Sequence, residues 1–308
     1  MKAIIYWDRR GHSLAPLTDR LPPCLMPVAG RPLIERTLDL LVDAGVRQVA
    51  LVSWTDHDCL IDALGTGSRW GLTLDHLWLH QESGAVDDWL DDADEALVLR
   101  GDALISPVIG AFLTIAAPVP GSLVHGTLQG RPALALARRR ADGQWRFPEE
   151  PFGGRGRPTP MGRSVGLEWG AVSLVETLAD YHAVNLSVVR GEFPGLVPFG
   201  RAIGLNLVAG AGSRVASSVN AAGQAHMGAN SMLHRGVTLA GTVSVGERVI
   251  IDRDTRVTDS VILPDTYIGP SLSVDNAIIW GQTIIRIDTQ AVLRVIDGFI
   301  LADLGLHA

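Results

Sequence analysis

The sequence predicts two fused domains, an α/β domain with a mainly parallel sheet and a parallel β-helix built from six-residue repeats. In the first half, short apolar runs alternate with segments whose apolar residues have helical spacing. In the second half, aliphatic residues recur at every sixth position. The first pattern predicts strands joined by helical crossovers, and the second predicts stacked coils. We place the domains at residues 1–192 and 193–308.

The α/β prediction starts from a strand–loop–helix–strand unit. Lys2–Tyr6 and Val49–Val52 are rich in β-branched and apolar residues, which favours buried strands. Between them, apolar residues from Leu33 to Val42 recur at three- and four-residue spacing and predict a helix. Such a unit implies a Rossmann-like parallel sheet with a right-handed crossover. Two further strands and a closing helix are expected at Ala96–Leu99, Pro132–Ala137 and Asp180–Gly191.

The second half follows a strict period of six. The repeated aliphatic positions are Met227, Leu233, Leu239, Val245, Ile251, Val257 and Leu263. A second register runs through Val237, Val243, Val249 and Val261, with Thr255 as its polar member. A coil with three short strands per turn gives this period, whereas a helix or a flat sheet does not. We therefore expect a left-handed parallel β-helix whose register slips by one residue after Pro264. The alternative is a run of unrelated short strands in a sandwich.

Composition excludes several classes of protein. The 308 residues are 47% hydrophobic and 19% charged, as in folded globular proteins. The net charge of −7 gives no reason to expect nucleic acid as a partner. Two cysteines, Cys24 and Cys59, form neither a disulfide framework nor a metal cluster, which favours a reducing cytoplasm. The longest apolar stretch, residues 108–124, contains two prolines and predicts a packed helix and a loop, so no membrane span is expected.

The loop after the first strand resembles the signature loop of the sugar-1-phosphate nucleotidyltransferase superfamily. The residues in the family's order and spacing are Leu14, Pro16, Leu17, Thr18, Pro22, Leu25, Pro27, Val28, Gly30 and Pro32. Three later segments, residues 65–71, 100–102 and 180–185, are similar to the family's glycine–serine turn, its metal-binding Gly-Asp and its closing helix. A trailing hexapeptide β-helix is also common in this superfamily, so the resemblance covers nearly the whole chain.

The resemblance implies a chemistry and a set of ligands. In this family a sugar phosphate attacks the α-phosphorus of a nucleoside triphosphate, and the protein neutralises charge, holds Mg²⁺ and aligns the reactants. Asp102 is then the metal ligand, although a helix N-cap explains this aspartate equally well. Gly11, Gln81 and Gly84 are the implied nucleotide contacts, with an exposed polar turn as the alternative for the last two.

The sequence departs from the family's pattern wherever a cation or a glycine is needed. The glycine pair that opens the loop corresponds to Asp8-Arg9-Arg10, and the loop arginine corresponds to Ser13. One family lysine falls on Pro23, and another falls on Glu150. The segment that carries the second metal aspartate is shortened. Since losing one charge-stabilising donor costs on the order of 10²–10³ in rate, we expect little activity.

Arg9 and Arg10 could replace part of the missing charge by contacting phosphate oxygens, or they are simply solvated. Lys2 is the only lysine in the chain, so a mechanism that needs a lysine has almost nowhere to find one.

Three functions therefore remain open. The first is an impaired nucleotidyltransferase-like protein of nucleotide-sugar or polysaccharide biosynthesis. It would act as a binding, regulatory or structural subunit in a homo- or hetero-oligomer formed through the β-helix. The second is an active nucleotidyltransferase that uses Arg9, Arg10 and Asp102 on a nucleoside triphosphate and a sugar phosphate. The third is a hexapeptide-repeat acyltransferase with His226 or His234 as its base, unless these histidines are only solvated.

Overall fold

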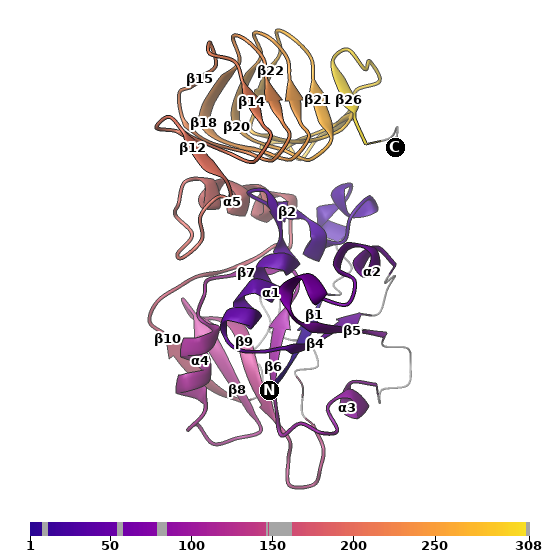
Figure 1. The fold of residues 1–308 in the computed structure, drawn as a ribbon, viewed down its shortest axis with the longest axis vertical. Coiled ribbons are helices and arrows are strands. Elements are labelled where there is room, and N and C mark those ends of the chain that lie inside the picture. The colour runs from indigo at the N-terminus through magenta and orange to yellow at the C-terminus, as the bar shows by residue number, and fades with distance from the viewer. Residues whose placement is uncertain (8–11, 54–57, 79–84, 146, 148–161, 306–308) are drawn as a thin grey trace. The chain divides into compact units, whose positions relative to one another are not determined.

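The computed structural model describes residues 1–7, 12–53, 58–78, 85–145, 147 and 162–305 (Figure 1). Contacts divide the chain into two units. The N-terminal unit comprises Met1–His12, Thr18–Leu25 and Leu33–Leu174, and the C-terminal unit comprises Ser13–Leu17, Met26–Pro32 and Val175–Ala308. Among the described residues, no helix is both long enough and apolar enough to cross a membrane.

The N-terminal unit is built on a seven-stranded sheet with the order β10-β8-β9-β6-β1-β4-β5. Its strands are β1 (Lys2–Tyr6), β4 (Gln48–Ser53), β5 (Thr73–Trp78), β6 (Glu95–Arg100), β8 (Leu123–Leu128), β9 (Arg131–Arg138) and β10 (Arg163–Leu167). Only β9 runs against its neighbours in this sheet. The prediction of a mainly parallel α/β sheet is confirmed, and β1 has the predicted bounds.

The direction of β9 follows from the turn before it. The strand lies where Pro132–Ala137 predicts it, but it pairs antiparallel with both β8 and β6. Gln129 and Gly130, between β8 and β9, have φ of 52° and 75°. Two consecutive positive φ values make a two-residue hairpin turn, which reverses the chain. The sequence predicts this strand but not its antiparallel direction.

Four helices and a small second sheet complete the described part of this unit. The helices are α1 (Leu33–Asp43), α2 (Asp58–Leu64), α3 (Ala85–Trp89) and α4 (Ile109–Ala116). Short 3-10 turns occur at Pro23–Leu25 and Ser68–Trp70, and two more, at His12–Leu14 and Leu17–Asp19, include residues of both units. The second sheet pairs β7 (Ala103–Ile105) with β11 (Val172–Leu174) in antiparallel fashion. Apolar residues of α1 and α4 pack against β1, β4 and β6 in one core, as the helical spacing predicts.

The C-terminal unit contains short strands stacked as successive coils (Figure 1). They are β12 (Arg201–Ile203), β13 (Leu207–Ala209), β14 (Arg214–Val215), β15 (Asn220–Ala221), β16 (Gln224–Met227), β17 (Met232–Leu233), β18 (Thr238–Val245), β19 (Ile250–Ile251), β20 (Arg256–Ile262), β21 (Thr266–Ile268), β22 (Ser273–Asp275), β23 (Ala277–Trp280), β24 (Thr283–Arg286), β25 (Val292–Arg294) and β26 (Leu301–Asp303). Asn220 pairs with Thr238, and Thr238 pairs with Arg256, in parallel and eighteen residues apart. Most strands of this unit therefore stack in parallel from one coil to the next, whereas β12, β24, β25 and β26 pair antiparallel with β13, β23, β24 and β21, respectively.

The interior of the coils is the aliphatic register that the sequence predicts, with one shift. Met227, Leu239 and Val257 belong to a single buried cluster. Between Ala240 and Val243 the pairing with β20 shifts by one residue, so that Val245 pairs with Ile262. The slip therefore occurs at this corner and not after Pro264. As a result Ile262, rather than the predicted Val261 and Leu263, belongs to the interior cluster.

Helix α5 (Leu178–Val189) packs against β16, β18 and β20 of the same unit. His182 Nε2 lies 2.8 Å from the carbonyl of Asp259, and Ser244 Oγ lies 3.5 Å from Asn185 Oδ1. These contacts group α5 with the coils, whereas the sequence places the boundary after residue 192. A hairpin formed by β2 (Pro27–Val28) and β3 (Arg31–Pro32) belongs to the same unit.

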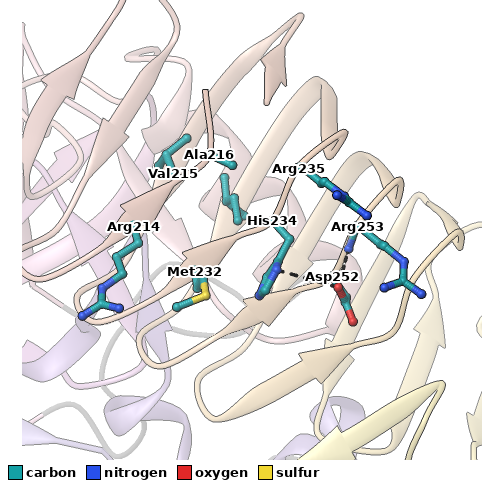
Figure 2. A pocket seen from close by; sticks show the side chains of 9 residues that line it. Arg214, Val215, Ala216, Met232, His234, Arg235, Asp252 and Arg253 are labelled. Carbon is teal, nitrogen blue, oxygen red and sulfur yellow. Dashed lines mark hydrogen bonds and ion pairs between the residues drawn. The ribbon is translucent and has the colours of Figure 1, made fainter. Parts of the chain in front are cut away.

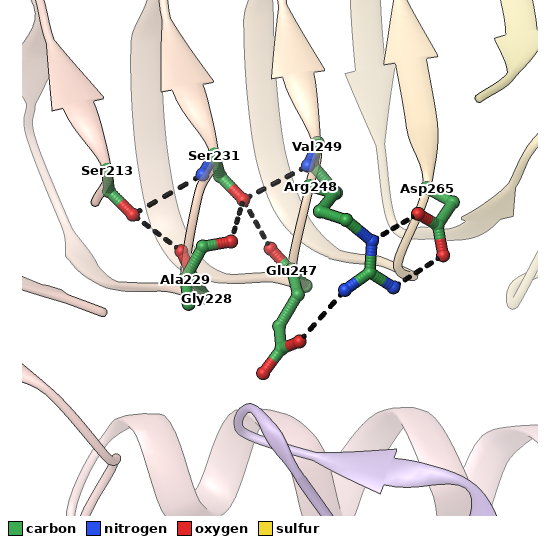
Figure 3. A network of polar contacts seen from close by, with 9 residues as sticks. Ser213, Gly228, Ala229, Ser231, Glu247, Arg248, Val249 and Asp265 are labelled. Carbon is green, nitrogen blue, oxygen red and sulfur yellow. Dashed lines mark hydrogen bonds and ion pairs between the residues drawn. The ribbon is translucent and has the colours of Figure 1, made fainter. Parts of the chain in front are cut away.

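Buried hydroxyl groups connect one coil to the next (Figure 3). Ser231 Oγ accepts a hydrogen bond of 3.0 Å from the amide of Val249 and donates one of 2.8 Å to the carbonyl of Gly246. Thr255 Oγ1 repeats the pattern with the amide of Leu272 and the carbonyl of Gly269. Corner amides and carbonyls that the strands leave unpaired are thereby satisfied inside the stack.

Candidate functional site

The carboxyl ends of β1 and β6 form the edge of the sheet where ligands bind in parallel α/β folds. The amide of Gly101 donates a hydrogen bond of 2.7 Å to the carbonyl of Tyr6, which joins the two strand ends. A Cβ atom at Gly101 would lie 2.6 Å from Cβ of Trp7 and 3.4 Å from Cβ of Cys24. Only glycine fits between these neighbours, so Trp7, Cys24 and the turn after β6 form one tight group.

Asp102 lies in this group and is held by an arginine. Arg100 Nε donates to Asp102 Oδ1 at 2.7 Å, and Arg100 Nη2 donates to Asp102 Oδ2 at 2.5 Å. The side chains are 3% and 6% exposed, respectively. Both carboxylate oxygens thus accept a charge-assisted bond in a buried, bidentate ion pair.

The residues described at this edge do not fit a Mg²⁺ site. Mg²⁺ needs free carboxylate oxygens and near-octahedral space, and it repels a guanidinium group. Both oxygens of Asp102 face Arg100. Among the described residues, no group of three or more His, Cys, Asp or Glu side chains is placed to hold a metal ion.

Cys24 follows the position where the family has a lysine, and it is fully buried. Burial raises the pKa of the Cys24 thiol well above its usual value, and the charges of Cys59 and Asp102 raise it further. The thiol is therefore neutral at neutral pH. Cys24 supplies neither a positive charge for phosphate nor a thiolate for a metal.

The only lysine of the chain is used elsewhere in the same unit. Lys2 begins β1, at the end of the strand opposite to Asp102. Its ammonium group donates a hydrogen bond of 2.5 Å to the carbonyl of Trp89, forms an ion pair with Asp92 and lies 4.6 Å from the centre of the Trp89 ring. These contacts keep its charge away from the carboxyl edge of the sheet.

The other site residues that the sequence suggests lie outside the described residues. They are Arg9, Arg10, Gly11, Gln81 and Gly84, together with Asp8 and Glu150. Their roles stay predictions.

The segment that resembles the family's closing helix forms hydrogen bonds with the β2–β3 hairpin in the C-terminal unit. Asp180 caps the start of α5 together with Thr177. The Tyr181 hydroxyl donates a hydrogen bond of 2.6 Å to the carbonyl of Pro27, and Asn185 Oδ1 accepts one of 2.9 Å from the amide of Ala29. These side chains hold the β2–β3 hairpin, which contains part of the signature loop.

The two histidines considered as acyl-transfer bases differ in access. His226 is 1% exposed, and its Nε2 lies 3.0 Å from the carbonyl of Phe199. A Cβ at Gly30 would lie 2.6 Å from Cε1 of this ring. His226 therefore cannot meet a ligand from solvent, whereas His234 can.

His234 lines a pocket on the outer side of the column β14-β17-β19 (Figure 2). The pocket has a volume of about 700 Å³, and we call it the arginine pocket. Its lining residues are Arg214, Val215, Ala216, Met232, Leu233, His234, Arg235, Asp252 and Arg253. Figure 2 shows His234 and Asp252 between Arg214 on one side and Arg235 and Arg253 on the other.

Sequence reasoning missed the partner of Asp102 and the arginine pocket. Arg100 and Asp102 are two residues apart, at the end of β6 and in the turn after it. This closeness in the sequence does not by itself show that the two side chains pair. Arg235 and Arg253 are eighteen residues apart, so the coil period itself places them in one column.

The nucleotidyl transferase family profile matches residues 2–120. Glucose-1-phosphate thymidylyltransferase of Mycolicibacterium smegmatis is 28% identical over 152 residues, which is 47% of this chain and 53% of that protein. N-acetylmuramate alpha-1-phosphate uridylyltransferase of Neisseria meningitidis is 40% identical over 75 residues, 24% of this chain and 32% of that protein. Translation initiation factor eIF2B subunit epsilon of Schizosaccharomyces pombe is 31% identical over 109 residues, 34% of this chain and 16% of that protein.

The chain thus spans about half, or less, of the length of these curated relatives. The matched residues include the signature loop, strands β1, β4 and β6, and the turn that carries Asp102. Residues 2–120 of the chain are therefore similar to the nucleotidyl transferase family.

Proposed function

We propose that this chain is a catalytically impaired, sugar-1-phosphate nucleotidyltransferase-like protein of nucleotide-sugar or polysaccharide biosynthesis. It acts as a binding, regulatory or structural subunit. The buried bidentate pair between Arg100 and Asp102 carries the proposal, because it engages the carboxylate that a metal would need. Any nucleotide that binds would bring its own Mg²⁺, and a nucleoside triphosphate or sugar phosphate is the expected ligand class.

The missing cations support the same conclusion. The neutral thiol of Cys24 lies beside Asp102, and Lys2 is bound at the other end of β1. Loss of one donor to a transferring phosphoryl group costs on the order of 10²–10³ in rate, so loss of several leaves little turnover. One relative over this region is named as a translation factor subunit rather than as a transferase.

The proposal also includes the predicted architecture of the C-terminal unit. We propose that the stacked coils of the C-terminal unit form a left-handed β-helix of hexapeptide repeats and serve as the surface for homo- or hetero-oligomers. The parallel pairing at an offset of eighteen residues supports this assignment. The domain boundary at residue 192 and a cytoplasmic location are further predictions.

An assay of pyrophosphate release tests the proposal. Thymidine and uridine triphosphates are each combined with glucose 1-phosphate or N-acetylmuramate 1-phosphate, with Mg²⁺, because the relatives are named for these reactions. We expect turnover at the level of the blank for wild type and for Asp102→Asn. Asp62→Asn, an exposed aspartate on α2, is the matched control.

A second candidate is an active nucleotidyltransferase with a non-standard loop, which the names of the transferase relatives favour. It requires Arg9 and Arg10 to hold phosphate and Asp102 to leave Arg100. Robust turnover that Asp102→Asn abolishes and Asp62→Asn leaves intact would establish this candidate and refute the first. A thermal-shift screen with the same nucleotides, with and without Mg²⁺, reports binding in the absence of turnover.

A further inference from the structure

The arginine pocket holds more positive charge than the coils neutralise. It contains three guanidinium groups, those of Arg214, Arg235 and Arg253, and one carboxylate, that of Asp252. None of the three arginines forms an ion pair with a carboxylate in the part of the chain that the structure describes. On the same coils, Arg248 is instead paired with Asp265 and Glu247. The pocket is therefore a positive region in a chain whose net charge is −7.

The single carboxylate of the pocket is already engaged by other groups. Asp252 Oδ1 accepts a hydrogen bond of 2.6 Å from the amide of Arg253, and Oδ2 accepts one of 2.9 Å from the Tyr267 hydroxyl. These bonds hold the pKa of Asp252 below its usual range, the Arg253 amide having the largest effect. Asp252 Oδ1 also lies 3.9 Å from Nδ1 of His234. The carboxylate is therefore fixed beside the histidine and does not hold a guanidinium group.

The coil period brings two of the arginines together. Met232 pairs with Ile250, so Arg235 and Arg253 occupy equivalent positions of adjacent coils. The amide of Asp254 donates to the carbonyl of Arg235 at 3.0 Å, which confirms that the two corners are stacked. Adjacent strands are about 4.8 Å apart, so two like charges lie close together at this corner. An anion between them would remove their repulsion.

The remaining walls of the pocket indicate the class of ligand. Ala216, Met232 and Val215 supply apolar surface next to the charged groups. A volume of about 700 Å³ is in the range of sites for small organic ligands. Guanidinium groups match the oxygens of phosphate in a bidentate geometry.

We propose that the arginine pocket binds a phosphorylated small molecule, whose phosphate oxygens contact Arg235 and Arg253 and whose apolar part lies against Met232. Arg214, on the other side of His234, adds positive potential to the same pocket (Figure 2). This site lies within the C-terminal unit and does not depend on whether the N-terminal unit is catalytic.

Isothermal titration calorimetry on the full chain tests the site. The probes are inorganic pyrophosphate, adenosine monophosphate and citrate, each at low salt. We expect both phosphate probes to bind to the wild type. The double variant Arg235→Gln/Arg253→Gln should lower their affinity by about tenfold or more for each arginine removed. Arg256→Gln, an exposed arginine of β20 outside the pocket, should leave the affinity within about twofold.

Three results would overturn the proposal. They are no binding of either phosphate probe by wild type, equal affinity of the double variant and wild type, and stronger binding of citrate than of the phosphates. An Arg9→Gln/Arg10→Gln variant distinguishes binding in the arginine pocket from binding by the N-terminal unit. If this variant alone loses binding, the ligand belongs to the N-terminal unit and the pocket proposal is wrong.

Discussion

Two arginine–aspartate pairs, one in each unit, share a geometry and differ in their surroundings. Arg100 and Arg248 each donate from Nε and Nη2 to the two oxygens of an aspartate, Asp102 and Asp265 respectively, over 2.5–2.8 Å. The side chains of the first pair are 3% and 6% exposed, and those of the second are 51% and 26% exposed. Figure 3 shows the second pair.

This comparison indicates that burial, not hydrogen-bond geometry, decides how much it costs to separate the two charges of such a pair. In the exposed pair, water replaces either partner at little cost. In the buried pair, each charge depends on the other, because neither can be solvated if its partner leaves. Asp102 is therefore tied to Arg100 by the cost of separating them, and this cost also opposes its use as a metal ligand.

The largest effect is expected from breaking the buried pair. Arg100→Met leaves the Asp102 carboxylate buried and uncompensated, and should lower the free energy of unfolding by about 3–5 kcal/mol. Urea unfolding followed by tryptophan fluorescence measures the change. The double variant Arg100→Met/Asp102→Leu removes both charges and should recover most of the loss. If the double variant is as unstable as the single one, the loss of stability comes from altered packing and not from the unpaired charge.

A buried hydrogen bond between uncharged groups tests the effect of burial in the absence of an ion pair. Ser231→Ala removes the acceptor for the amide of Val249 and should cost about 1–3 kcal/mol in urea unfolding. Ser218 is a matched control, because its hydroxyl accepts from the amide of Gly236 at 3.1 Å in an exposed position. Ser218→Ala should cost less than about 0.5 kcal/mol. Equal losses in the two variants would contradict the role given to burial.

The smallest effect is expected from the exposed pair. Arg248→Gln should lower the free energy of unfolding by about 0.2–1 kcal/mol, since the exposed guanidinium regains water. Repeating the urea titration in 1 M sodium chloride should shrink the difference further, because salt screens exposed charges. A loss as large as that of Arg100→Met would remove the distinction between the two pairs.

The coils were largely predictable because each carries the same constraint. One aliphatic side chain per strand must face the interior, so the period of six appears directly in the sequence. Met227, Leu239 and Val257 are buried, as expected of interior positions. The position of the slip was not predictable, because Val261, Ile262 and Leu263 are all aliphatic and all buried. Apolar character alone could not show which of them faces inward.

The N-terminal site was predictable only as far as its motif. The turn Arg100-Gly101-Asp102 lies where the resemblance puts it, at the carboxyl end of β6. Whether Asp102 faces a metal or an arginine depends on tertiary burial, which no motif records. Likewise, Pro132–Ala137 shows a strand, but its direction depends on positive φ at Gln129 and Gly130.

The shift at the corner between Ala240 and Val243 changes how this stack could grow. Before that corner one turn consumes eighteen residues, as from Met232 to Ile250, and after it one turn consumes seventeen, as from Val261 to Ile278. A duplicated turn keeps its aliphatic side chains facing the interior only if it has the length of the turns around it, which is eighteen residues before the corner and seventeen after it. Lengthening the stack by copying one universal repeat would therefore turn part of the interior outward.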